Sequence, residues 1–116
     1  MSRKLSLYLT DILTSINKIQ DYTDGFSYEE LTQDQRTLEA VIHNILIIGE
    51  ATKQIPKILR DQYPDIPWKA IAGMRDMIAH AYFDINTRII WNVLQQDLQS
   101  LKDCIEKLQQ NQNIDS

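Results

Sequence analysis

A chain of 116 residues can enclose one hydrophobic core but is too short for a second folding unit, so we expect a single domain. A hydrophobic content of 43%, with only three glycines and three prolines, excludes extensive disorder. A formal net charge of −4 argues against a protein that binds nucleic acid over its whole surface.

The first predicted element is a helix from about Arg3 to Asp21. Large aliphatic side chains recur there at alternating steps of four and three residues, which is the period of a helix with one buried stripe. These side chains are Leu5, Leu9, Ile12, Ile16 and Ile19. Turn-forming residues at 23–25 and a polar stretch as far as Gln35 separate this helix from the next.

The second predicted helix has the widest apolar face and should lie at the centre of the fold. Its stripe consists of Leu38, Val41, Ile42, Ile45, Ile48 and Ile55. Pro56 has no amide hydrogen to donate, so it should kink the helix or restart it before residues 57–60. His43 lies just before the most apolar part of this helix, and we expect it in the core or at its edge, without a functional role.

The second half of the chain predicts one short and one long helix. Pro67 suits the first turn of a short helix that carries Trp68 and Ile71, and Gly73 should break it. The last helix should begin after Asn86, whose side chain can cap it, and run to about Gln109.

Because no segment shows sustained alternation with a period of two, these elements predict an all-α fold, an up-down bundle of four to five helices. We place the domain at residues 1–110 and expect a frayed polar tail at 111–116. Wide apolar arcs in so short a chain leave surface to bury, and a homodimer is the commonest way to bury it.

The sequence predicts a cytoplasmic protein that does not enter membranes. Its longest aliphatic run, Ile45 to Ile48, is far shorter than the roughly 20 apolar residues of a membrane-spanning helix. Leucines after Lys4 alternate with polar residues instead of forming a secretory block. Cys104, the single cysteine, is expected as a small core residue. With two distant histidines and one thiol, we expect neither a metal site nor a cofactor.

Charge is distributed unevenly along the chain. Residues 53–75 contain five basic residues against two acidic ones. Lys53, Lys57 and Arg60 would form one basic stripe if Pro56 does not spoil the helical register. Such a stripe can guide RNA, but a solvated face or the docking surface of an acidic partner fits it equally well.

The densest group of chemically active side chains lies between Gly73 and Tyr82. Asp76 precedes His80 by one helical turn, so its carboxylate could accept the imidazole N–H and fix the tautomer. Arg75 and His80 are five residues apart, which separates them by roughly 140° on a regular helix. Their convergence on one substrate therefore requires a helix end, the long reach of Arg75, or a second subunit.

An arginine and a histidine suit RNA cleavage without a metal. Histidine exchanges protons near neutral pH, whereas arginine stays charged and binds phosphate bidentately. RNA supplies its own nucleophile, the 2'-hydroxyl group. A base, an acid and a cation would complete such a site, and the products would be a 2',3'-cyclic phosphate and a 5'-hydroxyl.

Arg75, His80 and Tyr82 form the pattern Arg-x4-His-x-Tyr. The surrounding segments are Gly49-Glu50-Ala51, Ile66-Pro67-Trp68, Gly73-Met74-Arg75-Asp76 and Tyr82-Phe83-Asp84. In this context the chain resembles the HepT-type toxins of the HEPN superfamily over about residues 5–108. The pattern Arg-x4-His alone would be weak evidence, because any helical protein can match it by chance.

The resemblance implies an all-α homodimer with a ribonuclease cleft at its interface, acting as the toxin of a toxin–antitoxin pair. It implies catalysis by Arg75 and His80 on mRNA or tRNA. It also implies an antitoxin, a minimal nucleotidyltransferase of the MntA type, that transfers AMP onto Tyr82. Phosphates attached there would repel RNA. Relatives often carry Asn at the position of Asp76, so this chain places an extra negative charge beside the phosphate site.

Structural roles for the same residues define a second hypothesis. Arg75 can be a simple ion-pair partner of Asp76, and Tyr82 can pack with Phe83 and Trp91. The chain would then be a non-catalytic helical dimer, and these residues would form the docking surface for a nucleotidyltransferase.

Overall fold

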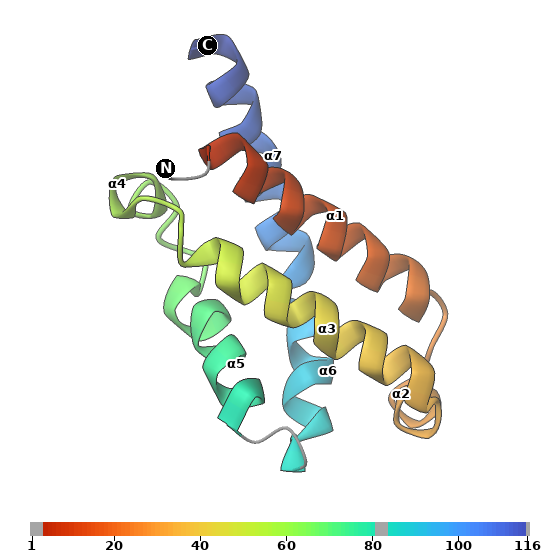
Figure 1. Cartoon of the computed structure of the whole chain (residues 1–116). Helices are drawn as coiled ribbons and strands as arrows, with labels where there is room; N and C mark the ends of the chain where they lie inside the picture. Colours follow the sequence, from red (N-terminus) through yellow and green to blue (C-terminus); the bar gives the residue numbers. More distant parts are fainter. Residues whose placement is uncertain (1–3, 81–83, 116) are drawn as a thin grey trace.

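The computed structural model describes residues 4–80 and 84–115, with side chains described up to residue 111. This part of the chain contains helices and no strand, which confirms the all-α prediction. The helices are α1 (Leu5–Thr23), α2 (Tyr28–Gln33), α3 (Gln35–Thr52), α4 (Lys57–Arg60), α5 (Trp68–His80), α6 (Thr87–Gln96) and α7 (Leu98–Asp115) (Figure 1). Seven helices in the described residues replace the four or five that we expected.

The central position of α3 is as predicted. It packs against α1 on one side and against α5 on the other, and α1 also packs against α7 (Figure 1). The aliphatic stripes of these helices meet in one buried cluster, which includes Ile16, Val41, Ile78 and Ile105. His43 lies on the opposite face of α3 and is exposed, so the prediction that it belongs to the core or its edge was wrong.

The helix α2 was not predicted, although the sequence contains a signal for it. The hydroxyl of Ser27 accepts the amide N–H of Glu30 at 3.1 Å, and the Glu30 carboxylate accepts the amide N–H of Ser27 at 3.1 Å. This reciprocal capping box satisfies two amide groups that a helix start leaves without partners. Leu31 then anchors the short helix in the core. The polar stretch after Phe26 is therefore a capped helix rather than a connector.

The last predicted helix is divided into two. Asn86 caps α6 as expected, because its side-chain oxygen accepts the amide N–H groups of Arg88 at 3.0 Å and Ile89 at 3.4 Å. The helix ends at Gln96, and α7 begins at Leu98, directly after the C-cap residue Asp97. It continues through Asp115, past the position where we expected a frayed tail.

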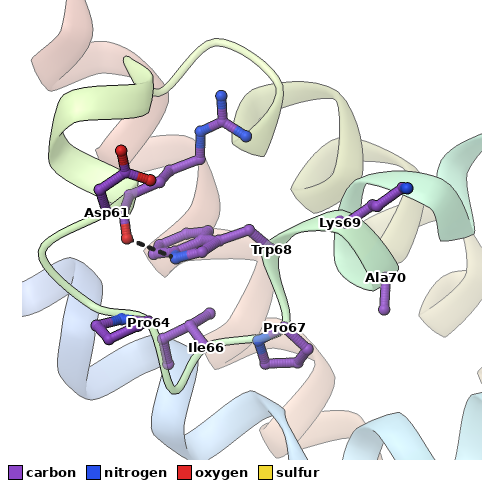
Figure 2. Close-up of a pocket in the computed structure, with 8 residues that line it drawn as sticks. Asp61, Pro64, Ile66, Pro67, Trp68, Lys69 and Ala70 are labelled. Atoms are coloured by element: carbon purple, nitrogen blue, oxygen red, sulfur yellow. Dashed lines mark hydrogen bonds between the residues drawn. The ribbon is translucent and has the colours of Figure 1, made fainter.

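Trp68 fixes the start of α5. Its indole Nε1–H donates to the carbonyl oxygens of Arg60 and Tyr63, both at 3.0 Å, and so ties α4 and the following loop to the new helix. Figure 2 shows Pro64, Ile66 and Pro67 around the indole, where they line a hollow together with Trp68.

No helix in the described residues is long and apolar enough to cross a membrane.

The helix α5 continues through Gly73, where we had expected a break. Ile71, Met74 and Ile78 form a buried stripe along α5 and hold it against the core on both sides of the glycine. The burial of these side chains outweighs the cost of one glycine in a helix, about 1 kcal/mol.

At Gly49 the backbones of α3 and α5 lie close together. A Cβ atom at Gly49 would lie 2.7 Å from the Cβ of Arg75 and 3.3 Å from the carbonyl oxygen of Ile71. Both distances are shorter than normal van der Waals contact. Only glycine therefore allows α5 to approach α3 at the turn that carries Arg75.

Replacing Gly49 and Gly73 by alanine should have opposite effects. Gly49→Ala forces the two helices apart and should lower the free energy of unfolding by about 1–3 kcal/mol. Gly73→Ala places its Cβ in open space and should raise that free energy by about 0.5–1 kcal/mol, because alanine is the better helix former. Urea unfolding measures both values. Equal effects would contradict the close approach at Gly49.

The Cys104 thiol should be hard to ionise. It is buried in the core, as predicted, and this burial raises its pKa to about 11. Because the unfolded chain loses the thiol proton nearer pH 9, this group should stabilise the fold below pH 9 and lose that contribution as the pH rises toward 11. Alkylation by iodoacetamide should follow the higher pKa in the native protein. A midpoint near pH 9 in both states would refute this prediction.

Candidate functional site

The helix α5 carries three of the predicted site residues, namely Arg75, Asp76 and His80. Because α5 is continuous, Arg75 and His80 keep the angular separation of roughly 140° that a regular helix imposes. Arg75 lies on the side of α5 that faces α3, whereas His80 is exposed in the last turn. Tyr82, the predicted modification site, lies outside the described residues.

Arg75 is held by two carboxylates. Its Nε lies 3.0 Å from Oε2 of Glu50 on α3, and one terminal guanidinium nitrogen donates to Oδ1 of Asp76 at 3.3 Å. The close approach at the neighbouring Gly49 brings the base of the Arg75 side chain next to α3. The guanidinium is therefore oriented by contacts on two helices, while 41% of its side chain stays exposed.

Sequence reasoning assigned no role to Glu50. The residue appeared only within the segment Gly49-Glu50-Ala51, and its pairing with Arg75 depends on how α3 and α5 pack. The glycine before it was the available signal, because a glycine inside an apolar helix often marks the close approach of another backbone.

Asp76 does not orient His80 through its carboxylate, so that prediction was wrong. Its Oδ1 accepts a hydrogen bond from the Nζ of Lys53 at 2.9 Å as well as the bond from Arg75. The hydrogen bond from Lys53 and, after it, the one from Arg75 hold the pKa of the Asp76 carboxyl below its usual value. The carboxylate is thus ionised at neutral pH and engaged with cations.

The backbone of Asp76 holds His80 instead. The ring nitrogen Nδ1 of His80 lies 2.8 Å from the carbonyl oxygen of Asp76. A carbonyl oxygen can only accept, so Nδ1 must carry the proton. In the neutral ring this leaves Nε2 unprotonated. His80 therefore presents a proton-accepting nitrogen from an exposed position.

The three basic residues proposed for RNA binding do not form one helical stripe. The helix α3 ends at Thr52, so Lys53 follows its last turn, and α4 restarts at Lys57 beyond Pro56. Lys53 contacts Asp76, and Lys57 forms an ion pair with Asp61 at 2.8 Å. Pro56 interrupts the helical register, as expected of a residue that has no amide hydrogen to donate.

Arg60, the third member of the proposed stripe, turns back onto its own segment. Its Nε–H donates to the carbonyl oxygen of Ile55 at 3.1 Å. Arg60 also borders the hollow around Trp68 that Figure 2 shows, and Arg75 and His80 are not among the residues lining that hollow.

The described residues contain no group of three or more His, Cys, Asp or Glu side chains placed to hold a metal ion.

Comparison with known proteins supports the resemblance. The family model described as "Ribonuclease HepT-like" matches residues 12–108. A protein of Thermococcus cleftensis named "Probable ribonuclease HepT" is 41% identical over 93% of this chain and 98% of its own length. "Putative RNase MJ0127" of Methanocaldococcus jannaschii is 35% identical over 88% of each chain. "Putative RNase TTE0752" of Caldanaerobacter subterraneus subsp. tengcongensis is 35% identical over 90% of this chain and 94% of its own. No solved structure matches this chain significantly.

The described residues form a small all-helical protein with an arginine and a histidine on one helix. The family match covers most of the chain and includes α5 with Arg75 and His80. The chain therefore belongs to the HepT-like ribonuclease family.

The tautomer of His80 provides a direct test of the site geometry. Long-range ¹H–¹⁵N correlation spectra of the neutral ring should show the proton on Nδ1, because the Asp76 carbonyl oxygen accepts it. Asp76→Asn should leave this tautomer unchanged, since the backbone carbonyl remains. A proton on Nε2, or a tautomer that changes in Asp76→Asn, would contradict the assigned hydrogen bond.

Proposed function

We propose that this chain is a metal-independent endoribonuclease in which His80 transfers protons and Arg75 binds the reacting phosphate. The observation that carries the proposal is the fixed imidazole of His80, whose Nδ1 is held by the Asp76 carbonyl while Nε2 has no hydrogen-bond partner among the described residues. Membership of the HepT-like ribonuclease family and relatives whose names contain ribonuclease or RNase support RNA as the substrate.

The reaction follows from these groups. A base removes the proton of the 2'-hydroxyl, and the resulting oxygen attacks the adjacent phosphorus. The bond from phosphorus to the 5'-oxygen breaks, and that oxygen receives a proton from an acid. Arg75 stabilises the charge that develops on the phosphoryl oxygens. The products are a 2',3'-cyclic phosphate and a 5'-hydroxyl.

One subunit holds its two groups on different faces of α5, so we propose that the active form is a homodimer. An isologous dimer interface that runs along α5 would place two copies of Arg75 and His80 around one cleft. One imidazole could then act as the base and its copy as the acid. The residues on the outer face of α5, which include Gly73 and His80, are exposed in this chain and free to face a partner.

We further propose that this nuclease is the toxin of a type VII-like toxin–antitoxin pair. An MntA-like nucleotidyltransferase would neutralise it by transferring AMP onto Tyr82, two residues after His80. The added phosphate would repel RNA from the cleft. Lys53, Lys57 and Arg60 remain our predicted contacts for the RNA backbone, with mRNA or tRNA as the substrate.

The second hypothesis is a non-catalytic dimer that only binds a nucleotidyltransferase. The ion pairs of Arg75 are the observation that favours it. Both carboxylates around this arginine are satisfied within one chain, as expected for a purely structural residue. This hypothesis places the exposed imidazole of His80 on the docking surface, whereas the nuclease uses it for proton transfer.

Cleavage of total RNA in the presence of EDTA separates the two hypotheses. The wild-type protein should produce fragments with cyclic-phosphate ends. His80→Ala should reduce the rate about 10²- to 10⁴-fold, because it removes a proton-transfer group. Arg75→Ala should reduce it about 10²- to 10³-fold, because it removes a cation that stabilises the transition state.

His43→Ala is the matched control, since His43 is exposed on α3 and has no assigned role. It should cleave RNA at the wild-type rate. Mass spectrometry of the purified protein first checks that AMP on Tyr82 has not silenced it. Intact RNA with unmodified wild-type protein, or full activity in His80→Ala, would refute the nuclease assignment.

A further inference from the structure

One oxygen atom on the surface joins two cations from different segments of the chain. Oδ1 of Asp76 lies 2.9 Å from Nζ of Lys53, just beyond α3, and 3.3 Å from a terminal nitrogen of Arg75 on α5. The three side chains are 51%, 33% and 41% exposed, so a solute can reach the point at which they meet. An ammonium group and a guanidinium directed at one oxygen form the arrangement that binds a phosphate oxygen.

We infer that Lys53 and Arg75 form a phosphate-binding site for the RNA backbone, and that the Asp76 carboxylate occupies this site when RNA is absent. The inference deepens the proposed function, on which it rests, by naming a second cation at the site and an internal competitor for it.

Glu50 leaves Arg75 able to bind a second anion. It contacts Nε, one edge of the guanidinium, while the terminal nitrogen Nη1 donates to Asp76. A phosphate that replaces the Asp76 carboxylate would therefore find donors already oriented by Glu50. Arginine offers five N–H donors, so one carboxylate does not exhaust its capacity.

Charge balance explains why Asp76 must move. The cluster contains two cations, Lys53 and Arg75, and two carboxylates, Glu50 and Asp76, so its formal charge is zero. Such a cluster offers little attraction to a phosphate until one carboxylate leaves. Lys53 and Arg75 hold the pKa of Asp76 below its usual value, so protonation does not remove its charge at neutral pH.

The Asp76 side chain can swing away without disturbing His80. The imidazole is held by the backbone carbonyl of Asp76, which belongs to α5 and does not depend on the carboxylate. Exposed ion pairs of this kind contribute little to stability, so the fold does not require the carboxylate to stay. RNA binding can therefore displace the competitor at low cost.

The test measures RNA affinity in a His80→Ala background, in which RNA is bound but not cleaved. The probe is a fluorescein-labelled single-stranded oligoribonucleotide, and fluorescence anisotropy gives its Kd. Asp76→Asn should tighten binding by about two- to fivefold, the range set by releasing exposed ion pairs. Lys53→Ala should weaken binding and make the dependence of log Kd on log salt shallower by about 0.7, the value for one phosphate on a single strand.

The double variant provides the decisive comparison. If Asp76 competes for Lys53, the gain from Asp76→Asn should shrink when Lys53 is already alanine. Asp103→Asn is the matched control, because Asp103 is exposed on α7, a helix that carries none of the proposed RNA contacts, and accepts a hydrogen bond from Gln99 at 3.0 Å. The same change of charge there should alter RNA affinity by less than Asp76→Asn does. Urea unfolding confirms that all variants are folded.

Each outcome of this test either supports or overturns the inference. Unchanged or weaker binding in Asp76→Asn, equal gains in Asp103→Asn and Asp76→Asn, or no RNA binding by any variant would overturn it. The expected affinities in a wild-type protein that does not cleave RNA would support the phosphate site and refute only the nuclease.

Discussion

The contact between α3 and α5 at Gly49 positions the charged groups around Arg75. Without a side chain at Gly49, α3 lies near the backbone of α5 at Arg75. This distance brings Glu50 to the guanidinium and Lys53 to Asp76. A wider separation would leave Arg75 as a long, mobile side chain on a helix surface. Burial of Ile71, Met74 and Ile78 supplies the packing energy that keeps α5 in this place.

Periodicity and local chemistry predicted much of the fold. The spacing of isoleucine and leucine located α1 and α3, and Asn86 was correctly identified as a helix cap. The errors arose where one local signal was read alone. Gly73 was read as a break, but the buried residues on either side of it keep α5 helical. Ser27 and Glu30 were read as loop residues, although their spacing is that of a capping box.

The residues of the site were partly predictable from the sequence, but the contacts among them were not. The sequence placed Arg75, Asp76 and His80 on one helix. For Arg75 and His80 to converge, it required a helix end, the long reach of Arg75 or a second subunit. A spacing of four residues allows Asp76 to reach His80 with either its carboxylate or its carbonyl, and sequence cannot choose between them. Lys53 decides the matter by drawing the carboxylate away, and that contact exists only after α3 packs on α5.

These contacts separate the tasks of the site among different atoms. The carbonyl oxygen of Asp76 determines which ring nitrogen of His80 carries the proton, and Glu50 orients Arg75. The carboxylate of Asp76 engages the cations that RNA would use. In the proposed reaction, the RNA's own 2'-hydroxyl is the nucleophile. A substrate with a single 2'-deoxynucleotide on the 5' side of a mapped cleavage bond tests it most directly. We predict that cleavage at that bond stops while neighbouring sites are still cut. Unchanged cleavage at the deoxy position would contradict the mechanism.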